Sequence, residues 1–598
     1  MPTQRRSHTC GELNRSHVGQ SVVLNGWVNT TRVYNDQVFI DLRDRYGLTQ
    51  VVFEAERSEL AAAAREAGRE WCLAVRGTVR PRLPGKENPK LPTGAVEVEA
   101  TELVVLNRCP VPPFEVMSVP QDDQTLGDPE LANEDLRLQY RYLDLRRPTL
   151  QRTLIMRHQL CQVIRTHLSA QGFLELETPL LGRSTPEGAR DYLVPSRVHP
   201  GEWYALPQSP QIYKQLLMVS GYDKYFQIAR CLRDEDLRSD RQPEFTQLDF
   251  EMSFVERAGV LGVGGGLPAA VCRECRGVTT PLPLPRLSYA DVMLRYGTDK
   301  PDLRYGLEIV EATDLAAQTE FKVFREAVAA GGKVRGLRVA GAVEKFSRKQ
   351  LDDLGEFVKR AGAKGLAWIK VEADKFTSPI EKFLPAAAQA ALRQRFAAEP
   401  GDLLLLVADS EAVVCQALGT LRAHLAQMLK LYDPTRPDFK IAWVIDFPSF
   451  IWDEVEQRWA ANHHPFTAPK DEHLHLLETD PGQVQAKAYD LVINGYECGG
   501  GSIRIHDPEV QARLFAVLGM TPEQARSRFG FLLDALKCGA PPHGGIAWGI
   551  DRWAMMLAGT TNIRDVIAFP KNQRARDLMT GAPAGVDLKQ LKELGLAR

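Results

Sequence analysis

Residues 230–254 of the chain read RCLRDEDLRSDRQPEFTQLDFEMSF, a run in which two strand-like ends enclose a charged loop. Side chains alternate between the two faces of a strand. In the second end, one face carries Thr246, Leu248, Phe250 and Met252. The other face carries Phe245, Gln247, Asp249 and Glu251. The pattern predicts a β-hairpin in a sheet that has one apolar face and one face with a ring, an amide and two carboxylates.

The loop between these predicted strands holds Arg233, Arg238 and Arg241 together with Glu235 and Gln242. One arginine can bind two phosphate oxygens at once. An aromatic ring can lie against a base, and carboxylates can bind an amine or a metal ion. The hairpin is therefore suited to a nucleotide. The alternative interpretation is a solvated loop whose charges pair with one another.

Composition limits the class of protein. At 598 residues the chain is too long for one hydrophobic core, so several domains are expected. A net charge of −2 argues against a protein that coats nucleic acid, although it allows a local basic face. No apolar run is long enough to span a membrane, and MPTQRRSHTCGEL lacks the apolar segment of a secretory signal. We expect a cytoplasmic multidomain protein without membrane contact.

The ten cysteines are scattered singly apart from Cys272 and Cys275, which suits reduced thiols in a cytosol. One C-x-x-C without a second pair is a weak zinc signal.

The first hundred residues contain five short β-rich runs and one helix-like segment, SELAAAAREAG. This order predicts a small barrel of the OB type, a fold that often binds oligonucleotides. In QVFIDLRD, Val38, Ile40 and Leu42 share one face, so Phe39 lies among charges on the other. Phe39 can stack on an unpaired base there, or a neighbouring loop can cover it. RGTVRPRLPGKENPK, residues 76–90, adds basic residues that can contact phosphates, with a solvated face as the alternative.

Glycine-rich segments mark further candidate contacts. Three consecutive glycines in NGYECGGGSIRIHD let a ligand approach the backbone, and Ser502 and Arg504 follow on one face. HGGIAWGIDRWAMML places Arg552 at the start of a predicted helix, and QSPQIYKQLLM places Gln211 and Lys214 in the first turn of another. The chain lacks a G-x-x-x-x-G-K-[ST] loop. If ATP binds, it binds in a different geometry.

These motifs resemble the class II aminoacyl-tRNA synthetases, and within them the bacterial-type aspartyl-tRNA synthetases. FLELETPLL, the RDE of residues 233–235 and the GIDR of residues 549–552 resemble the three general motifs of the class, the first of which is associated with its dimer interface. The strings TPEGARDYLVPSR, ALPQSPQ, DRQPEFTQLD, HHPFT, GGGSIRIHD and IAFPK resemble the aspartyl enzymes more specifically, in the same order over nearly the whole chain.

The resemblance implies a multidomain α+β fold class: an N-terminal OB-fold β-barrel, a catalytic domain on an antiparallel sheet, and an α/β insertion domain. It implies an anticodon-binding domain at 1–108, a hinge at 109–140, the catalytic domain at 141–306 and 422–570, a bacterial-type insertion at 307–421 and a C-terminal extension at 571–598. It also implies a homodimer.

The implied activity has two steps. ATP activates L-aspartate to aspartyl-adenylate with release of pyrophosphate, and the aspartyl group then passes to the 3′ end of tRNA-Asp, with tRNA-Asn left open as a second acceptor. Alignment and charge neutralisation matter more in these steps than a protein nucleophile. The chief catalytic residues implied are Arg233 and Arg552.

The resemblance assigns ATP contacts to Arg233, Asp234, Glu235, Gln242, Phe245, Glu497, Gly549, Ile550, Asp551 and Arg552. It assigns aspartate contacts to Glu187, Ser209, Gln211, Lys214, Arg233, Asp249, His463 and Arg504. It assigns Mg²⁺ to Asp490 and Glu497. It assigns anticodon contacts to Arg32, Phe39, Gln50, Arg80, Arg82, Asn88 and Glu97.

Two departures from the family pattern stand out. Residues 30–33 read TTRV where relatives usually read RRRD, next to positions linked to discrimination between tRNA-Asp and tRNA-Asn. Residues 257–278 are glycine-rich where relatives have a continuous helix, which puts that helix in doubt. The rival interpretations are a lysyl- or asparaginyl-type class II synthetase and a non-catalytic tRNA-binding relative. Arg504 argues against the first two, and the intact Arg233, Glu497 and Arg552 argue against the third.

Overall fold

The computed structural model describes residues 5–116, 132–184, 189–235, 240–434 and 436–596. The chain forms two compact units. Unit 1 comprises Met1–Arg157, Leu237–Gln242 and Thr560–Gly585. Unit 2 comprises His158–Asp236, Pro243–Gly559 and Val586–Arg598.

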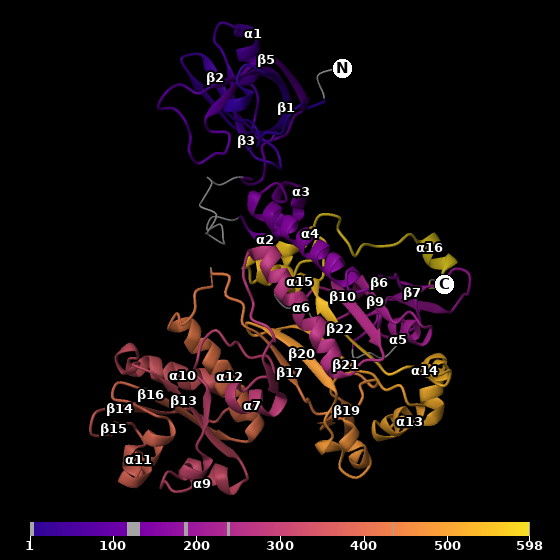
Figure 1. The fold of residues 1–598 in the computed structure, drawn as a ribbon. Coiled ribbons are helices and arrows are strands. Elements are labelled where there is room, and N and C mark those ends of the chain that lie inside the picture. The colour runs from indigo at the N-terminus through magenta and orange to yellow at the C-terminus, as the bar shows by residue number, and fades with distance from the viewer. Residues whose placement is uncertain (1–4, 117–131, 185–188, 236–239, 435, 597–598) are drawn as a thin grey trace. The chain divides into compact units, whose positions relative to one another are not determined.

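Unit 1 begins with a closed five-stranded barrel (Figure 1). Its strands, in the order β1-β2-β3-β5-β4, are β1 (Ser21–Tyr34), β2 (Gln37–Arg43), β3 (Leu48–Phe53), β5 (Val96–Asn107) and β4 (Cys72–Pro81). Helix α1 (Ser58–Arg65) lies between β3 and β4 in the chain. Five strands, one helix and closure of the barrel confirm the predicted OB fold.

The alternation predicted for β2 is also observed. Val38, Ile40 and Leu42 are fully buried in the barrel core, whereas Phe39 is half-buried. Arg43 differs from its neighbours on the outer face because it is buried and makes two 2.8 Å hydrogen bonds with Glu70.

The helical part of unit 1 is organised by one buried carboxylate. It contains α2 (Glu134–Gln139), α3 (Arg141–Asp144) and the start of α4 (Pro148–Ser169), which continues into unit 2. Asp144 is fully buried and accepts from Arg141 at 2.7 Å, Arg147 at 3.3 Å and Arg137 at 3.5 Å. Arg141 also donates to the carbonyls of Arg564, Ile567 and Ala568. These bonds tie the helices to the 560–585 segment of the same unit.

Unit 2 is built on an eight-stranded sheet in the order β11-β17-β20-β21-β22-β10-β9-β6. The strands are β11 (Arg286–Ser288), β17 (Ile441–Ile445), β20 (Ala488–Ile493), β21 (Tyr496–Ile503), β22 (His543–Gly549), β10 (Glu244–Ser253), β9 (Lys224–Leu232) and β6 (Leu174–Glu175). Only the outermost pairs, β11–β17 and β6–β9, are parallel among the described strands of this sheet. The predicted hairpin is the β9–β10 pair, with Asp249 opposite Gln227.

Helices α5 (Gln211–Val219) and α15 (Ile550–Ala558) pack against β10, and α6 (Arg257–Arg276) packs against β22. Glycine-rich residues 257–276 are therefore helical, which resolves the doubt raised by their composition. A Cβ at Gly264 would lie only 3.1 Å from the ring of Trp443 on β17, so glycine lets the helix lie close to the sheet. Packing outweighs the weak helix propensity of glycine here.

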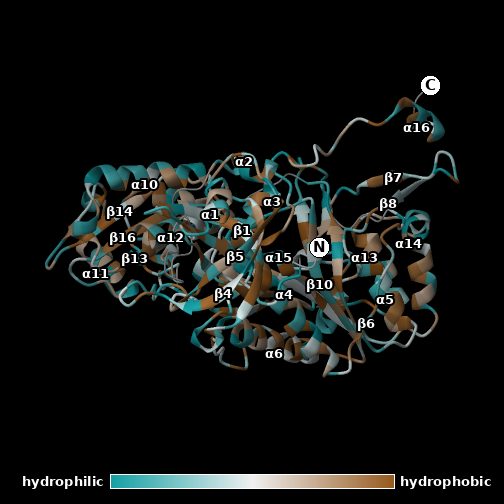
Figure 2. Cartoon of the chain, turned by 90° about the horizontal axis from the view of Figure 1, so that it is seen from above, coloured by the Kyte–Doolittle hydropathy of each residue, from teal (hydrophilic) through white to brown (hydrophobic). Residues whose placement is uncertain are grey.

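Unit 2 also contains a five-stranded sheet in the order β12-β13-β16-β14-β15. The strands are β12 (Ile309–Glu311), β13 (Lys333–Val339), β16 (Leu403–Asp409), β14 (Ala367–Val371) and β15 (Phe376–Thr377). The helices are α8 (Thr313–Ala316), α9 (Lys322–Ala329), α10 (Arg348–Arg360), α11 (Ala386–Arg395) and α12 (Glu411–Met428). Each face of the sheet has its own apolar core, and α10 turns a hydrophilic side outward (Figure 2).

Among the described residues, unit 2 also contains two hairpins outside the large sheets and four further α-helices. They are the β7 (Leu193–Pro195)–β8 (Trp203–Ala205) and β18 (Phe450–Asp453)–β19 (Arg458–Ala461) hairpins and helices α7 (Tyr289–Tyr296), α13 (Pro508–Val517), α14 (Pro522–Leu536) and α16 (Leu588–Glu593). None of the described helices combines the length and apolarity needed to cross a membrane. Within the described residues there is also no cluster of three or more His, Cys, Asp or Glu that fits a metal ion, so Cys272 and Cys275 form no such group.

Replacing Asp144 by alanine should destabilise unit 1 strongly. Breaking a buried ion pair from one side costs about 3–5 kcal/mol because the partner charges stay buried. The matched control is Asp352→Ala, which removes an exposed pair with Arg348 and should cost only about 0.3–0.5 kcal/mol. Calorimetric unfolding of both variants measures the difference, and equal small losses would contradict the role given to Asp144.

Candidate functional site

The polar face of the eight-stranded sheet carries a cluster of buried charges, which we call the four-charge network: Lys214, Asp249, Glu251 and Arg504. Asp249 and Glu251 come from β10 and point to the same face because they are two residues apart. Lys214 comes from the first turn of α5, and Arg504 follows directly after β21. All four side chains are at most 2% exposed.

The network is tightly bonded. Lys214 Nζ lies 2.6 Å from Asp249 Oδ1 and 3.3 Å from Glu251 Oε2. Arg504 donates from Nε to Glu251 Oε1 at 2.9 Å and from Nη2 to Glu251 Oε2 at 3.1 Å. Burial opposes ionisation of Glu251, but Arg504 and Lys214 outweigh burial and lower its pKa. Burial dominates at Asp249 and raises its pKa.

The other edge of Arg504 faces polar groups that carry no formal charge. Nη1 donates to Ser502 Oγ at 2.6 Å and lies 2.8 Å from His464 Nε2. Burial, followed by the charge of Arg504, holds the pKa of His464 well below its usual value. His464 is therefore neutral, and its Nδ1 accepts from the backbone N–H of Phe466 at 3.2 Å.

Several buried polar atoms of predicted site residues lack a hydrogen-bond partner among the described residues. They are Gln211 Nε2, Asp249 Oδ2, Arg233 Nε and His463 Nδ1. Gln211 lies one helical turn before Lys214, and Asp249 belongs to the network itself. An unsatisfied buried polar atom is costly, so a set that contains both donors and an acceptor fits a polar ligand that carries both kinds of group.

A second group of predicted residues lies at the β22–α15 junction. Asp551 accepts from the backbone N–H of Thr246 at 2.7 Å, which fixes the start of α15 against β10. Arg552 donates to the carbonyl of Glu497 at 2.8 Å. The Arg233 guanidinium lies 5.2 Å from the centre of the Phe245 ring. Two arginines and a ring therefore come from neighbouring strands and one helix start.

Asp490 and Glu497 form a carboxylate pair beside Gly500. A Cβ at Gly500 would lie 3.0 Å from Asp490 Oδ1 and 3.4 Å from Glu497 Oε1. Burial and the neighbouring Glu497 raise the pKa of Asp490 well above its usual value. Two carboxylates beside the same glycine fit a divalent cation with oxygen ligands, which would offset the repulsion between them.

Three predicted contacts need separate mention. Glu187 lies outside the described residues. Gln242 belongs to unit 1, where it exchanges hydrogen bonds with the backbone of Lys571. Ser209 accepts from the N–H of Gln211 at 3.3 Å and so helps to begin α5.

Sequence reasoning did not assign Glu251, His464 or Ser502, the groups that hold Arg504. The sequence signal for Glu251 is the alternation of EFTQLDFEM, which places Glu251 on the same strand face as Asp249.

The outer face of the barrel in unit 1 carries four of the predicted anticodon contacts in one chain of hydrogen bonds. Arg32 donates to Gln50 at 3.1 Å, Gln50 donates to Glu97 at 2.7 Å, and Arg80 donates to Glu97 at 2.8 Å. Phe39 lies opposite Arg32 in the β1–β2 pair. Arg82 donates to the carbonyl of Val96, and Asn88 accepts from the N–H of Lys90 in the β4–β5 loop. The face thus combines one half-buried ring with positioned polar groups.

Comparison with known proteins agrees with this geometry. Residues 133–573 match the family model described as tRNA synthetases class II (D, K and N). Residues 22–106 match the model of an OB-fold nucleic acid binding domain.

Similar proteins include the aspartate–tRNA(Asp/Asn) ligase of Geotalea uraniireducens, 54% identical over 99% of this chain and 98% of that protein. The aspartate–tRNA ligase of Geobacillus kaustophilus is 52% identical with the same coverage. Among solved structures, an aspartyl-tRNA synthetase from Leishmania major described as putative gives a TM-score of 0.59 at 17% identity and covers 95% of this chain and 94% of that one. The asparaginyl-tRNA synthetase of Pyrococcus horikoshii with asparaginyl-adenylate gives 0.56 at 19% identity, covering 94% and 97%. These two likenesses concern the fold alone.

The expected fold class and the resemblance to aspartate–tRNA ligases are confirmed. Because the family model matches residues 133–573, well over half of the sequence, the chain belongs to the class II tRNA synthetases of the D, K and N group.

Proposed function

We propose that the protein is an ATP-dependent aspartate–tRNA ligase that forms aspartyl-adenylate and pyrophosphate and then aminoacylates tRNA-Asp. The observation that carries the proposal is the four-charge network, because it distinguishes aspartate from the other amino acids of the D, K and N group. Both of its cations, Lys214 and Arg504, lie on the polar face beside the unsatisfied atoms of Gln211 and Asp249.

The charge of each amino-acid side chain decides the specificity. The carboxylate of aspartate can accept from Arg504 Nη1, which here faces the uncharged Ser502 and His464, and a bond between guanidinium and carboxylate is stronger than one to a neutral group. Asparagine would turn an amide N–H toward a guanidinium N–H, and lysine would bring a third cation to Lys214 and Arg504. Leaving buried donors unpaired discriminates strongly against such analogues. Asp249 Oδ2 is available for the α-ammonium group.

Arg233, Phe245 and Arg552 suit the nucleotide. Arg233 neutralises charge at the α-phosphate and orients the aspartate α-carboxylate for attack, while Arg552 and Phe245 enclose the base. No protein nucleophile is needed, since alignment and charge neutralisation supply the acceleration. Asp234, Glu235, Gly549, Ile550 and Asp551 complete the proposed ATP contacts, and His463 and Ser209 those of aspartate.

Mg²⁺ is the cofactor that the Asp490–Glu497 pair fits, because hard cations of this kind bind one or two carboxylates together with substrate phosphates. When bound, the ion would neutralise phosphate charge. The barrel supports the tRNA part of the proposal: Phe39 stacks on an anticodon base, and Arg32, Gln50, Arg80, Arg82, Asn88 and Glu97 contact base edges and backbone.

We further propose a cytoplasmic homodimer with the domain limits given by the sequence. Leu174, Leu180 and Leu181 are about half exposed near the first class motif, an apolar surface that suits a second copy of the chain. None of the ten cysteines, all within the described residues, forms a disulfide bond, which fits a reducing compartment.

Pyrophosphate exchange with aspartate, asparagine and lysine tests the central claim. Aspartate alone should support exchange; exchange driven by asparagine or lysine, or none at all, would refute it. Charging purified tRNA-Asp and tRNA-Asn side by side then decides the acceptor range.

Replacing Arg504 by leucine should remove aspartate activation. Loss of the contact to the substrate and of both Arg504 hydrogen bonds to the buried Glu251 costs about 3 kcal/mol, on the order of 100-fold in kcat/KM for aspartate. ATP binding should stay within about twofold. Arg513→Leu on α13, which breaks an exposed pair with Glu478, is the control. Unchanged exchange in the Arg504 variant would show that Arg504 does not bind the substrate.

Replacing Phe39 by alanine should weaken tRNA charging without changing adenylate formation. Stacking of one base on an aromatic ring contributes about 1–3 kcal/mol, so KM for tRNA should rise about 5-fold to 150-fold. Val18→Ala, a change at an exposed residue of unit 1, should leave KM unchanged. Equal losses in charging and in exchange would count against stacking.

Replacing Asp490 by asparagine should raise the Mg²⁺ concentration needed for half-maximal exchange by about tenfold or more. The control is Asp352→Asn, because Asp352 lies on α10 beside the five-stranded sheet and not on the eight-stranded sheet that carries Asp490. An unchanged Mg²⁺ midpoint would mean that Asp490 is not a ligand.

A further inference from the structure

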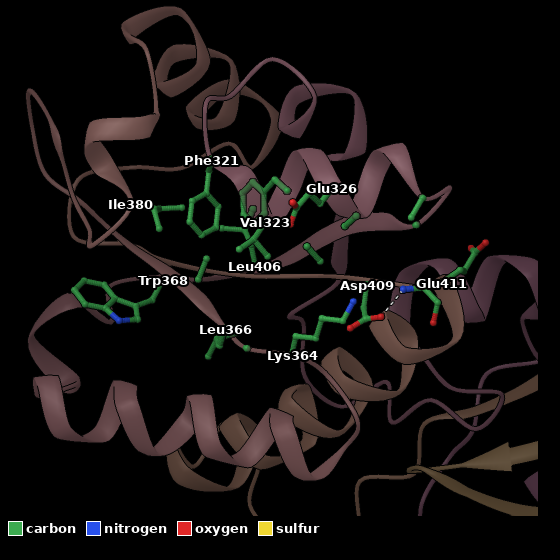
Figure 3. A pocket seen from close by; sticks show the side chains of 18 of the residues that line it. Phe321, Val323, Glu326, Lys364, Leu366, Trp368, Ile380, Leu406, Asp409 and Glu411 are labelled. Atoms are coloured by element: carbon green, nitrogen blue, oxygen red, sulfur yellow. Dashed lines mark hydrogen bonds between the residues drawn. The ribbon is translucent and has the colours of Figure 1, made fainter.

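The five-stranded sheet of unit 2 contains a cavity of about 770 Å³ that the proposed reaction does not use. Its size falls in the range of about 300–1,000 Å³ that is usual for small-molecule sites. Figure 3 shows that it lies between α9, the ends of β14 and β16, and the segment around Ile380. It belongs to a different sheet from the four-charge network.

The inner walls of the cavity are apolar. Phe324, Leu406 and Ile380 are buried around it, and Phe321 and Val323 stand at its side. The lining also includes small residues, Ala367, Ala408 and Ala327. Small side chains among the large apolar ones leave room for a ligand with an apolar body.

One end of the cavity is polar. Lys364 and Asp409 line it, and Figure 3 shows the ammonium and carboxylate groups turned toward each other. Neither residue forms an ion pair with any residue that the structure describes. By contrast, Glu411 is paired with Arg335, and Glu326 with Lys322. Asp409 Oδ1 accepts from the backbone N–H of Ser410 at 2.8 Å. This end therefore offers one cation and one anion that belong to no ion pair among the described residues.

The backbone at this end is open. A Cβ at Gly331 or Gly365 would meet nothing within 4 Å, so a ligand can approach both glycines. Ser410 also lines the cavity, and it precedes α12 without a side-chain hydrogen bond to that helix.

We propose that this cavity is a second ligand site, which binds a free apolar α-amino acid. Lys364 pairs with the α-carboxylate, Asp409 pairs with the α-ammonium, and the side chain occupies the space over Ala367 and Ala408. An α-amino acid carries both charges on one carbon, which matches a cation and an anion at the same end of an apolar cavity. Aspartate does not fit, because its side-chain carboxylate would enter the apolar part.

Calorimetric titration of the full-length protein with L-phenylalanine tests the proposal, with L-aspartate present to occupy the catalytic site. We expect saturable millimolar binding. Phenethylamine, which lacks the carboxylate, and 3-phenylpropionate, which lacks the ammonium, should each bind about tenfold more weakly or worse. Absence of saturable binding by L-phenylalanine, or equal binding of all three compounds, would overturn the proposal.

Variants locate the site. Lys364→Ala and Asp409→Asn should each weaken L-phenylalanine binding by about tenfold, and Ala408→Leu, which places a larger side chain in the cavity lining, should abolish it. Lys349→Ala, at an exposed lysine of α10, is the matched control and should bind normally. Aspartate-dependent pyrophosphate exchange should be unchanged in all four, which confirms that they fold. Normal binding by Lys364→Ala and Ala408→Leu would place the bound amino acid elsewhere and refute the assignment.

Discussion

Two cations and two carboxylates share a nearly dry volume on the polar face of the eight-stranded sheet. Burying any one of these charges alone would cost a large desolvation free energy. The set is stable only because each charge has an oppositely charged partner at hydrogen-bond distance. Glu251 accepts hydrogen bonds from Nε and Nη2 along one edge of the Arg504 guanidinium. Lys214 is paired with both Asp249 and Glu251. The remaining edge of Arg504 is thereby fixed in direction before any ligand arrives. Such preorganisation is what substrate discrimination by charge requires.

The same constraint explains the architecture around the network. Asp249 and Glu251 come from the middle of the sheet, where β9 and β22 flank β10 on both sides. Arg504 directly follows β21, the strand with three consecutive glycines. The Tyr489 hydroxyl on β20 donates to the carbonyl of Gly545 on β22, and β21 lies between these two strands. A Cβ at Gly501 would lie 2.2 Å from that carbonyl, so only glycine allows this close pairing. The backbone is thus adapted to the position of the charges.

The expectations from the sequence succeeded where a pattern has a short-range cause. Alternation along residues 244–253 and 37–43 correctly gave the faces of β10 and β2, because a strand repeats every two residues. The helix at 257–276 was doubted because glycine propensity is a local quantity, whereas its contact with Trp443 joins residues about 180 positions apart. Arg43 follows the outer face of β2 by alternation, yet it is buried because it pairs with Glu70, which lies between α1 and β4 in the chain.

The sequence by itself determined the family, the order of the folded parts and the types of side chain available for binding, since these depend on motif identity and on local periodicity. Tertiary structure alone decided which of those side chains meet. It paired Glu251 and His464 with Arg504, left Asp249 Oδ2 and Gln211 Nε2 without partners, and opened a cavity between α9 and β14. These contacts join residues that are tens to hundreds of positions apart in the chain. Only the packing of helices against the two sheets sets such distances, so no local pattern encodes them.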